Sequence, residues 1–509
     1  MAPQVLIVGA GPTGLVLAIC LARHGVALRI IDKNSGPGQA SRAMAVHART
    51  LEFYRQLGFG DVVVNLGIKV EAIHLREGGE DVIELPFKDI GAGLSPYPFV
   101  LAFPQDDHER FLVEQLKALG VEVEWNTTLA SFTQDEWGVR AMLERDGAHV
   151  ACNSTYLCGC DGAHSRVRES LKLDFAGGTY DHLYYVADVK TSGPDNRDLV
   201  GHIGANTFAL MLPVRSRGMQ RLIGIMPPQA EAMPEPGFED VRPVLEPLLG
   251  IRVEQVNWFS TYRVHHRVAS QFHAGRCFLS GDAAHVHSPA GGQGMNTGIG
   301  DAVNLSWKLA QVLQARADPS LLDTYQAERI VFARKLVATT DRVFQLVVSQ
   351  GASGQLLRKW LVPHLLPMLA GFAAARRTAF KTLSQVQIHY PDSALSAGRA
   401  GDVIGGDRLP WVPQADGGDN FEALQSLEWQ LHVYGTASPA LDAAACGLSL
   451  PLHVYPWTEA AADAGLLRDA AYLIRPDMHV ALAMPRQELD TLHDVAARHH
   501  LRFAHRKND

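Results

Sequence analysis

The sequence predicts an α/β fold: a Rossmann-like dinucleotide-binding domain, an inserted and mostly antiparallel sheet, and a small C-terminal α/β domain. Three observations support this prediction. The pattern Gly9-x-Gly11-x-x-Gly14 lies between an apolar strand and a helix. Residues 180–275 alternate apolar and polar side chains, which is typical of an antiparallel sheet with one covered face. The Gly/Pro/Asp-rich stretch 396–418 is typical of a linker, and strand-like runs follow it.

The elements of the first domain follow from the apolar pattern. Val5 to Val8 is a short apolar run that ends in glycine, as a buried parallel strand does. Residues 12–24 place apolar side chains on one helical face, and Leu28 to Ile31 is a second strand that ends at Asp32. Further helices are expected over residues 44–57, 109–118 and 300–350, and further strands over residues 121–125, 429–434 and 471–477.

Composition limits the classes of function. The 509 residues suffice for two to four domains, and a net charge of −8 without any basic run argues against a nucleic-acid partner. The six cysteines include no Cys-x-x-Cys pair, so neither a disulfide framework nor a zinc ribbon is indicated, and free thiols fit a reducing compartment. No run of 18 residues is uniformly apolar. We therefore expect a cytoplasmic protein without stable membrane insertion.

The glycine pattern near the N-terminus predicts a dinucleotide site. Gly9 permits a tight turn, Gly11 lets the backbone approach a pyrophosphate, and Gly14 lets helix and strand pack closely. The pyrophosphate would lie at the positive end of the helix, and Asp32, eighteen residues after the last glycine, could bind the adenosine ribose. An ordinary glycine-rich strand–helix turn is the alternative. The other residues expected at this turn are Pro12, Thr13 and Lys33.

A second segment, residues 276–301, favours FAD over NAD. Asp282 follows an apolar strand, a loop with Gly291, Gly292 and Gly294 comes next, and a helix opens near residues 296–300. This arrangement suits a second contact on a long cofactor. Asp282 would bind the ribitol hydroxyls, and the positive helix end would favour the anionic reduced flavin. The alternative is a glycine-rich loop for another ligand. The pair His285-x-His287 has no third ligand in view, so no metal is expected.

Two further motifs leave their roles open. Arg42, in Ser41-Arg-Ala43, could clamp phosphate oxygens, or it could be a solvated surface arginine. In the segment Cys158 to Arg168, Asp161-Gly162 is suited to a tight turn and Ser165 to a helix cap. Asp161 could be purely structural. His164 and Arg168 would face either solvent or a phosphate-bearing partner.

These motifs, in their order along the chain, resemble those of the class A flavoprotein aromatic hydroxylases, which have the para-hydroxybenzoate hydroxylase fold. The likeness covers about residues 1–395. Ser41-Arg-Ala43 and Phe103-Pro-Gln105 resemble the phenol-type and polyketide-type members. Gly406 to Pro410 and Tyr472 to Asp477 are similar to their C-terminal thioredoxin-like domain, here without a Cys-x-x-Cys pair.

The resemblance implies a domain plan. A glutathione-reductase-type FAD domain with a helical extension would comprise residues 1–70, 98–175 and 276–395. A substrate-binding β-sheet domain would comprise residues 71–97 and 176–275, and the thioredoxin-like domain would comprise residues 396–509.

The resemblance also implies roles for single residues. FAD would be bound by Gly9, Gly11, Gly14, Asp32, Arg42, Gln105, Asp161 and Asp282. The isoalloxazine would be contacted through backbone groups of Gly292, Gly294, Met295 and Asn296. Pro289 and Gly292 would form the catalytic flavin–substrate interface, without a dedicated nucleophile. The NAD(P)H path would pass His164 and Arg168. Gln293 stands where parent members have a basic residue, so charge tuning could differ.

The implied activity is that of an FAD-dependent monooxygenase that uses NADPH or NADH and molecular oxygen. It would hydroxylate a phenolic or polycyclic aromatic substrate through a C4a-hydroperoxyflavin, as a monomer or homodimer. Baeyer–Villiger oxidation, epoxidation and oxygen-independent oxidoreduction on the same fold are alternatives, and so is a non-enzymatic flavin-binding partner. The candidates to line the substrate pocket are Tyr184, Tyr185, His202, Tyr262 and His265, although residues at such positions are more often ordinary sheet residues.

Overall fold

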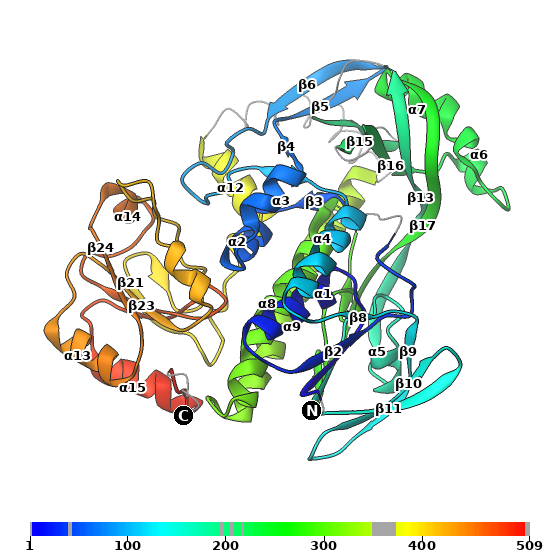
Figure 1. Cartoon of the computed structure of the whole chain (residues 1–509). Coiled ribbons are helices and arrows are strands. Elements are labelled where there is room, and N and C mark those ends of the chain that lie inside the picture. The colour runs from blue at the N-terminus through cyan, green and yellow to red at the C-terminus, as the bar shows by residue number, and fades with distance from the viewer. Residues whose placement is uncertain are drawn as a thin grey trace.

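In the computed structural model, the first domain is built on a mostly parallel sheet, in which only β18 among the described strands pairs antiparallel, with β19. The structure describes residues 3–38, 43–192, 198–203, 207–214, 218–288, 290–348 and 373–503. The sheet order is β18-β19-β12-β1-β2-β8 (Figure 1). The strands are β1 (Val5–Val8), β2 (Leu28–Ile31), β8 (Val123–Glu124), β12 (Tyr156–Gly159), β18 (His273–Ala274) and β19 (Cys277–Leu279). Strand β1 pairs in parallel with β2 and β12, so the first two predicted strands are confirmed.

Long helices cover this sheet. Helix α1 (Pro12–Arg23) is buried along most of its length and packs against α4 (Gln105–Ala118) and α8 (Gln293–Leu313). Helix α9 (Asp323–Val348) runs beside α8 through the middle of the molecule (Figure 1). The helix expected over residues 300–350 is therefore two helices, and the first begins at Gln293, earlier than the sequence predicts.

The inserted sheet forms the upper part of the molecule in Figure 1. Its order is β20-β17-β13-β16-β15-β14-β5-β6, and all its pairings are antiparallel except β14 with β5. The strands are β5 (Ala72–Glu77), β6 (Glu80–Pro86), β13 (Phe175–Ser192), β14 (Leu199–Ile203), β15 (Phe208–Val214), β16 (Met219–Ile225), β17 (Arg252–Ala269) and β20 (His285–Val286). The predicted, mostly antiparallel sheet is confirmed, and helix α7 (Arg242–Leu249) covers part of one face.

Two small sheets were not predicted. Strands β9 (Thr127–Gln134), β10 (Val139–Arg145) and β11 (Ala148–Ser154) form an antiparallel meander. Strand β7 (Val100–Ala102) pairs with β3 (Ala45–Val46) and β4 (Ile68–Val70). Because residues 45–46 belong to a strand, the helix expected over residues 44–57 is shorter, as α2 (Ala48–Gln56), and α3 (Gly60–Leu66) follows it.

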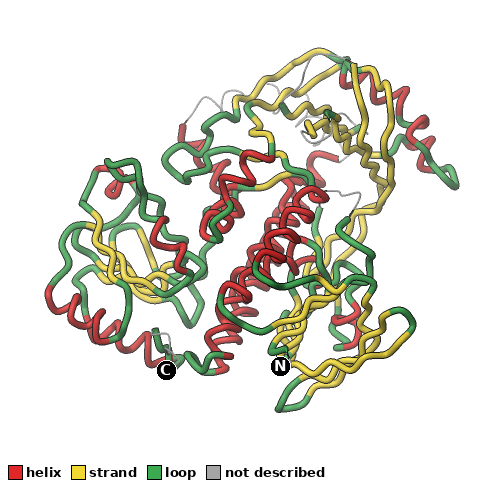
Figure 2. The backbone as a smooth tube through the Cα atoms, in the orientation of Figure 1, coloured by secondary structure: helices red, strands yellow, loops and turns green. Residues whose placement is uncertain are grey.

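The C-terminal part has its own sheet, in the order β22-β21-β26-β25-β23-β24. Figure 2 shows its strands as a separate group on the left of the molecule. The elements are β21 (Ala397–Ala400), β22 (Val403–Ile404), β23 (Gln430–Tyr434), α13 (Pro439–Gly447), β24 (Leu452–Tyr455), α14 (Glu459–Asp463), β25 (Ala471–Ile474), β26 (Val480–Met484) and α15 (Leu489–Arg498). The linker prediction for residues 396–418 is wrong, since β21 and β22 lie within it. A Cβ atom at Gly398 would lie 2.2 Å from the carbonyl oxygen of Ala483, so this glycine permits close packing.

The C-terminal sheet docks directly on the first domain. The rings of Trp307 on α8 and Trp429, just before β23, meet edge to face with centroids 5.5 Å apart, and both are buried. A buried apolar cluster joins Trp307 and Leu321 to the C-terminal strands. The tail is thus packed onto α8, the helix that also follows the glycine loop.

Candidate cofactor site and active site

The turn between β1 and the start of α1 contains two kinds of glycine. Gly9 has φ +105°, and a Cβ atom there would lie 2.3 Å from the carbonyl oxygen of Cys160. A Cβ atom at Gly14 would lie 2.0 Å from the carbonyl oxygen of Gly9. At Gly11, by contrast, no atom of the described residues lies within 4 Å of the added Cβ. The fold itself therefore requires Gly9 and Gly14, whereas the space at Gly11 is left for a ligand.

The start of α1 can receive an anion. Gly11 is the N-cap, no side chain caps the helix, and Pro12 occupies the first turn. The free N–H groups and helix dipole attract phosphate. Asp32, just beyond β2, accepts bonds from the N–H groups of Ala10 at 2.7 Å and Asn34 at 2.8 Å, and the adjacent Lys33 is exposed. The carboxylate thus closes the turn at the carboxyl ends of the strands, where dinucleotides bind in such sheets.

The turn that carries Asp282 meets the first motif through Thr13. Gly281 has φ +62°, and a Cβ atom there would lie 2.6 Å from Oγ1 of Thr13. A Cβ atom at Gly298, on α8, would lie 2.3 Å from the same oxygen. Asp282 is exposed between buried Gly281 and Ala283. The two cofactor motifs predicted from the sequence therefore lie side by side.

The glycine loop leads directly into α8. Gly291 and Gly292 both have left-handed backbone conformations, with φ +71° and +62°. Gly292 is the N-cap of α8, and no side chain caps the helix. Its positive end is thus open to an electron-rich ligand edge. Gly294 and Met295 lie in the first turn and are partly buried.

Polar side chains hold this loop from behind. The side chain of Asn296 accepts bonds from the N–H of His47 (2.9 Å) and the hydroxyl of Thr50 (2.8 Å), and donates to the carbonyl oxygens of Ala45 and Gly292 (2.8 Å each). Its amide is therefore fully used by the protein. Any contact of Asn296 with a cofactor would be made by its backbone, as the resemblance implies.

His47 and Gln293 also brace the loop, and no sequence pattern indicates this role for His47. The Nε2 of His47 lies 2.8 Å from the carbonyl oxygen of Gly291, and burial lowers the pKa of this histidine to about 4. The amide of Gln293 donates to the carbonyl oxygen of Leu383 at 2.9 Å and accepts from Gln385 at 2.6 Å. Gln293 is buried, so it holds the loop from within the protein.

The segment around Asp161 supports the same site. Asp161 accepts bonds from the hydroxyl of Ser165 (2.5 Å) and the N–H of Val167 (3.1 Å), and Ser165 caps α5 (Arg166–Ser170). Burial is the main cause that raises the pKa of Asp161. Arg168 is buried and donates to the carbonyl oxygens of Ala283 (2.9 Å) and Ala163 (2.7 Å).

Arg168 thus braces the Asp161 segment against the Asp282 turn, whereas His164 is exposed. Their place on a nicotinamide path stays a prediction. Gln105 donates to Glu109 at 2.8 Å, and Glu109 accepts from the N–H of Gly38 at 2.8 Å. This contact fastens the chain beyond Asp32. Two other predicted residues, Arg42 and Pro289, lie outside the described residues.

An aromatic and apolar face of the inserted sheet is turned toward the cofactor domain. Tyr184 on β13 pairs directly with Tyr262 on β17, with ring centroids 5.9 Å apart. Ile225 packs with Tyr184, and Ile223, two residues earlier on β16, shares its face. Ile223 packs against an apolar cluster that contains Met44 of the cofactor domain. This face therefore closes over the side of the domain that carries the glycine loop.

The side chains of three other candidates for the substrate pocket do not lie on this face. Tyr185 belongs to the cluster on the opposite face, beneath α7. His202 shares that face with Val200, and its Nδ1 lies 2.8 Å from the carbonyl oxygen of Arg76. The ring of His265 pairs with the hydroxyl of Thr179 at 2.7 Å, one position along β17 from buried Val264. Of the five candidates, Tyr184 and Tyr262 therefore lie on the face that is turned toward the cofactor domain.

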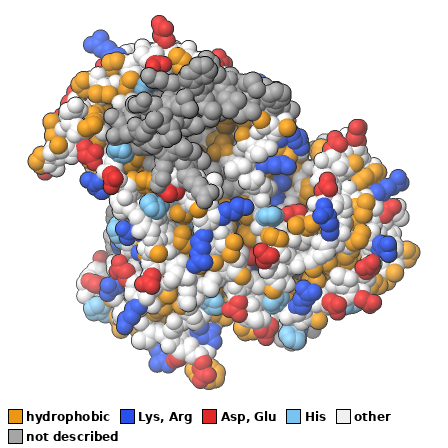
Figure 3. All heavy atoms as spheres, turned by 180° about the vertical axis from the view of Figure 1, so that it is seen from behind, with side chains coloured by type: hydrophobic (Ala, Val, Ile, Leu, Met, Phe, Trp, Pro, Cys, Tyr) orange, Lys and Arg blue, Asp and Glu red, His pale blue; other side chains and the backbone are white. Residues whose placement is uncertain are grey.

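The described residues contain neither a membrane-spanning helix nor a cluster of metal ligands. Within the described residues no helix is long and apolar enough to cross a membrane, and no group of three or more His, Cys, Asp or Glu could hold a metal ion. His285 pairs with buried Asp301 at 2.7 Å. Figure 3 shows Lys and Arg side chains interspersed with Asp and Glu on the face that it presents, not gathered into a basic tract.

The fold and this site define a flavoprotein. Residues 2–340 match the FAD binding domain family, and the chain belongs to that family. It is a flavin-dependent monooxygenase of the class A aromatic hydroxylase type.

Named relatives agree with this class. The chain is 39% identical to 6-methylpretetramide 4-monooxygenase of Streptomyces rimosus over 419 residues, 79% of this chain and 72% of that protein. Its structure is similar to OxyS anhydrotetracycline hydroxylase from Streptomyces rimosus, with a TM-score of 0.78 and 28% identity over 97% of this chain and 98% of that one. The chain is also 31% identical to dialkyldecalin synthase of Streptomyces rugosporus, over 96% of this chain and 98% of that protein.

Proposed function

We propose that this monooxygenase hydroxylates a phenolic ring of a polycyclic aromatic compound of the polyketide type, with NADPH or NADH as reductant. The substrate class is supported by the names of the two tetracycline-related relatives. The use of NAD(P)H is supported by the single Gly-x-Gly-x-x-Gly pattern, because a transient nicotinamide needs no fold of its own.

The observation that carries the proposal is the meeting of the α1 turn, the Asp282 turn and helix α8 at Thr13. Its side chain touches both the Asp282 turn and α8, so one elongated ligand can follow all three. We propose that its pyrophosphate lies in the space beside Gly11. The ribose would lie near Asp32, the ribitol near Asp282, and the ring system against the backbone of Gly292 and the first turn of α8.

These residues fit FAD chemically. When bound, FAD supplies the reducing equivalents and the activation of oxygen that hydroxylation requires. The N–H groups at the start of α8 would stabilise negative charge at the ring edge of the cofactor. The face of Tyr184 and Tyr262 would exclude water from the reacting centre and stack on an aromatic substrate.

A polar pair lies at the border of that face. The hydroxyl of Tyr180 donates to the carboxylate of Asp341, on α9, at 2.5 Å, and its ring contacts His266 at 4.9 Å between centroids. Tyr180 packs beside Tyr184. We propose that this pair binds a hydroxyl group of the substrate and fixes which ring position faces the cofactor.

We propose further that the C-terminal part is a thioredoxin-like domain with a structural role. Its core runs β23-α13-β24-α14-β25-β26-α15, and its strand order is β24-β23-β25-β26. Parallel β23 and β24 beside an antiparallel β25–β26 pair support this assignment. Without a Cys-x-x-Cys pair, it has no dithiol for redox chemistry. The domain limits given by the resemblance, with residues 396–509 last, are part of this proposal.

The experiment is a panel of polycyclic phenols given to the purified, FAD-loaded enzyme with NADPH or NADH under ¹⁸O₂. We expect stimulated NAD(P)H oxidation and one ¹⁸O atom in a hydroxylated product. A labelled lactone or epoxide would instead indicate one of the other oxygen insertions. A product of unchanged mass, formed without oxygen, would contradict the proposal and favour oxygen-independent chemistry on the same fold.

A further inference from the structure

One buried carboxylate anchors the turn that presents Asp282. Asp301, on α8, accepts a bond from the N–H of Gly281 at 3.0 Å and pairs with Nε2 of His285 at 2.7 Å, both through Oδ2. Asp301 is fully buried. Residues on both sides of Asp282 are therefore tied to the same oxygen atom. Because Gly281 is also in a left-handed conformation against Thr13, the direction of the following peptide is closely determined.

Asp301 is held in turn by Arg329 on α9. The Nε of Arg329 donates to Oδ1 of Asp301 at 2.6 Å, and its two terminal nitrogens donate to the hydroxyl of Tyr390 at 2.8 Å and the carbonyl oxygen of Thr297 at 3.1 Å. Burial, the largest influence, opposes ionisation of Asp301, but the positive charge of Arg329 keeps its pKa below the usual range. An ionised carboxylate can accept all three bonds that reach it.

Tyr390 brings this chain of contacts to the C-terminal part. Its ring lies 4.7 Å from that of His479 and 5.6 Å from the guanidinium of Arg475. Its N–H donates to the carbonyl oxygen of Gly406 at 3.0 Å. The phenol therefore stands between the C-terminal sheet and α9.

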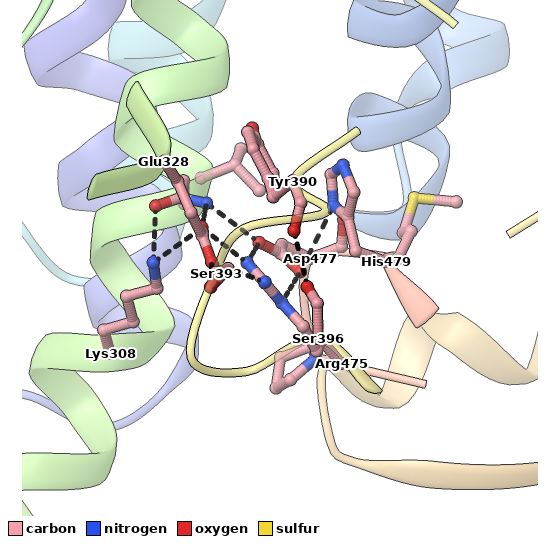
Figure 4. A network of polar contacts seen from close by, with 12 residues as sticks. Lys308, Glu328, Tyr390, Ser393, Ser396, Arg475, Asp477 and His479 are labelled. Carbon is pink, nitrogen blue, oxygen red and sulfur yellow. Dashed lines mark hydrogen bonds and ion pairs between the residues drawn. The ribbon is translucent and has the colours of Figure 1, made fainter. Parts of the chain in front are cut away.

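Figure 4 shows the charged core behind Tyr390. Arg475 reaches both oxygens of Glu328, at 2.7 and 2.9 Å, and Asp477 at 2.5 Å, while Lys308 reaches Glu328 at 2.8 Å. All four side chains are buried. A continuous path of buried polar groups thus leads from the C-terminal sheet to the N–H of Gly281.

We propose that Asp301, Arg329 and Tyr390 are positioning residues that fix the Gly281 turn, so that Asp282 meets the cofactor. This makes the C-terminal part a support of the cofactor site. The proposal rests on the assignment of Asp282 to FAD made above. None of the three residues needs to touch the cofactor.

Tyr390→Phe tests the proposal with little disturbance, because it removes one hydroxyl and keeps the ring on His479. The matched control is Tyr434→Phe, which removes a buried hydroxyl within the C-terminal part, bound by Asn420 at 2.7 Å. FAD affinity of each apoprotein is measured by titration of flavin fluorescence, and apoprotein stability by thermal unfolding. We expect Tyr390→Phe to weaken FAD binding about five- to tenfold and the control less than about twofold, since a hydrogen bond to a charged group is lost only in the first.

A double variant separates positioning from general weakening. If Tyr390 acts through Asp282, Tyr390→Phe should change FAD affinity less than about twofold when Asp282→Ala is already present. Equal affinity losses with and without Asp282, or an effect on unfolding alone with unchanged FAD affinity, would overturn the proposal. If Asp282→Ala itself leaves FAD affinity unchanged, the assignment of Asp282 fails instead, so the two failures are distinguishable.

Discussion

Thr13 and Gly281 touch across the two cofactor motifs: a Cβ atom at Gly281 would lie 2.6 Å from Oγ1 of Thr13. Thr13 opens α1, and Gly281 precedes Asp282, so this contact sets how closely the two halves of the site approach. Only a glycine fits at position 281, because the backbone is left-handed there and the space is already filled.

Gly281→Ala should therefore lower both stability and FAD affinity. The left-handed conformation alone costs an alanine about 1–2 kcal/mol, and the overlap with Thr13 adds to that. Gly25→Ala is the matched control, because Gly25 has φ +72° but no atom within 4 Å of an added Cβ. Chemical unfolding and FAD titration of both variants measure the difference. Equal losses of stability and of FAD affinity in the two variants would show that the Thr13 contact contributes nothing to either.

The two glycines around the start of α1 should behave in opposite ways. Gly11→Ala should leave apoprotein stability within about 0.5 kcal/mol, since the added methyl group enters open space, but weaken FAD binding at least about tenfold. Gly14→Ala should disrupt folding, because its Cβ would lie 2.0 Å from a backbone oxygen. Thermal unfolding of the apoproteins and flavin titration separate the two effects. Unchanged FAD affinity in Gly11→Ala would remove the pyrophosphate from this turn.

The C-terminal part should not be removable as a separate unit. Arg475→Ala leaves the buried carboxylates of Glu328 and Asp477 without their main cation, which should cost about 3–5 kcal/mol. Arg468→Ala removes only an exposed pair with Asp469 and should cost less than about 1 kcal/mol. Urea unfolding of the two variants measures the contrast. Similar small losses in both would mean that the buried network adds little to stability.

Local patterns of the sequence predict the cofactor domain well. The bounds of β1 and β2 agree with the prediction, and α1 ends one residue early, because apolar runs next to glycine turns leave little choice of structure. The Asp282 turn was also located, since an acidic residue after a buried strand and before a glycine loop is an unusual combination.

Contacts between distant segments could not be predicted in this way. Asp301 lies in the interior of a helix, and nothing around it in the sequence indicates that it bonds to Gly281 and Arg329. The linker prediction for residues 396–418 is wrong for a related reason. Its glycines are typical of a flexible linker, but Gly398 and Gly405 are required by close backbone neighbours.

His47 should make stability depend on pH in the acid range. Its Nε2 faces the carbonyl oxygen of Gly291, which can only accept, so Nε2 carries a proton. Burial lowers the pKa of His47 to about 4, from an unfolded value of about 6.5. Between these two pKa values, the unfolded chain therefore binds a proton on His47 that the folded chain does not bind. The stability contributed by neutral His47 is fully present above pH 6.5 and is lost as the pH falls toward 4.

His47→Gln keeps a donor for Gly291 and removes the titration. Between pH 7.5 and pH 5 the wild-type apoprotein should lose about 2 kcal/mol more unfolding free energy than this variant. Urea unfolding at the two pH values gives the comparison, and His164→Gln, at an exposed position, is the control. If the unfolding free energy of His47→Gln falls between pH 7.5 and pH 5 as much as that of the wild type, the buried neutral histidine is not the source of this pH dependence.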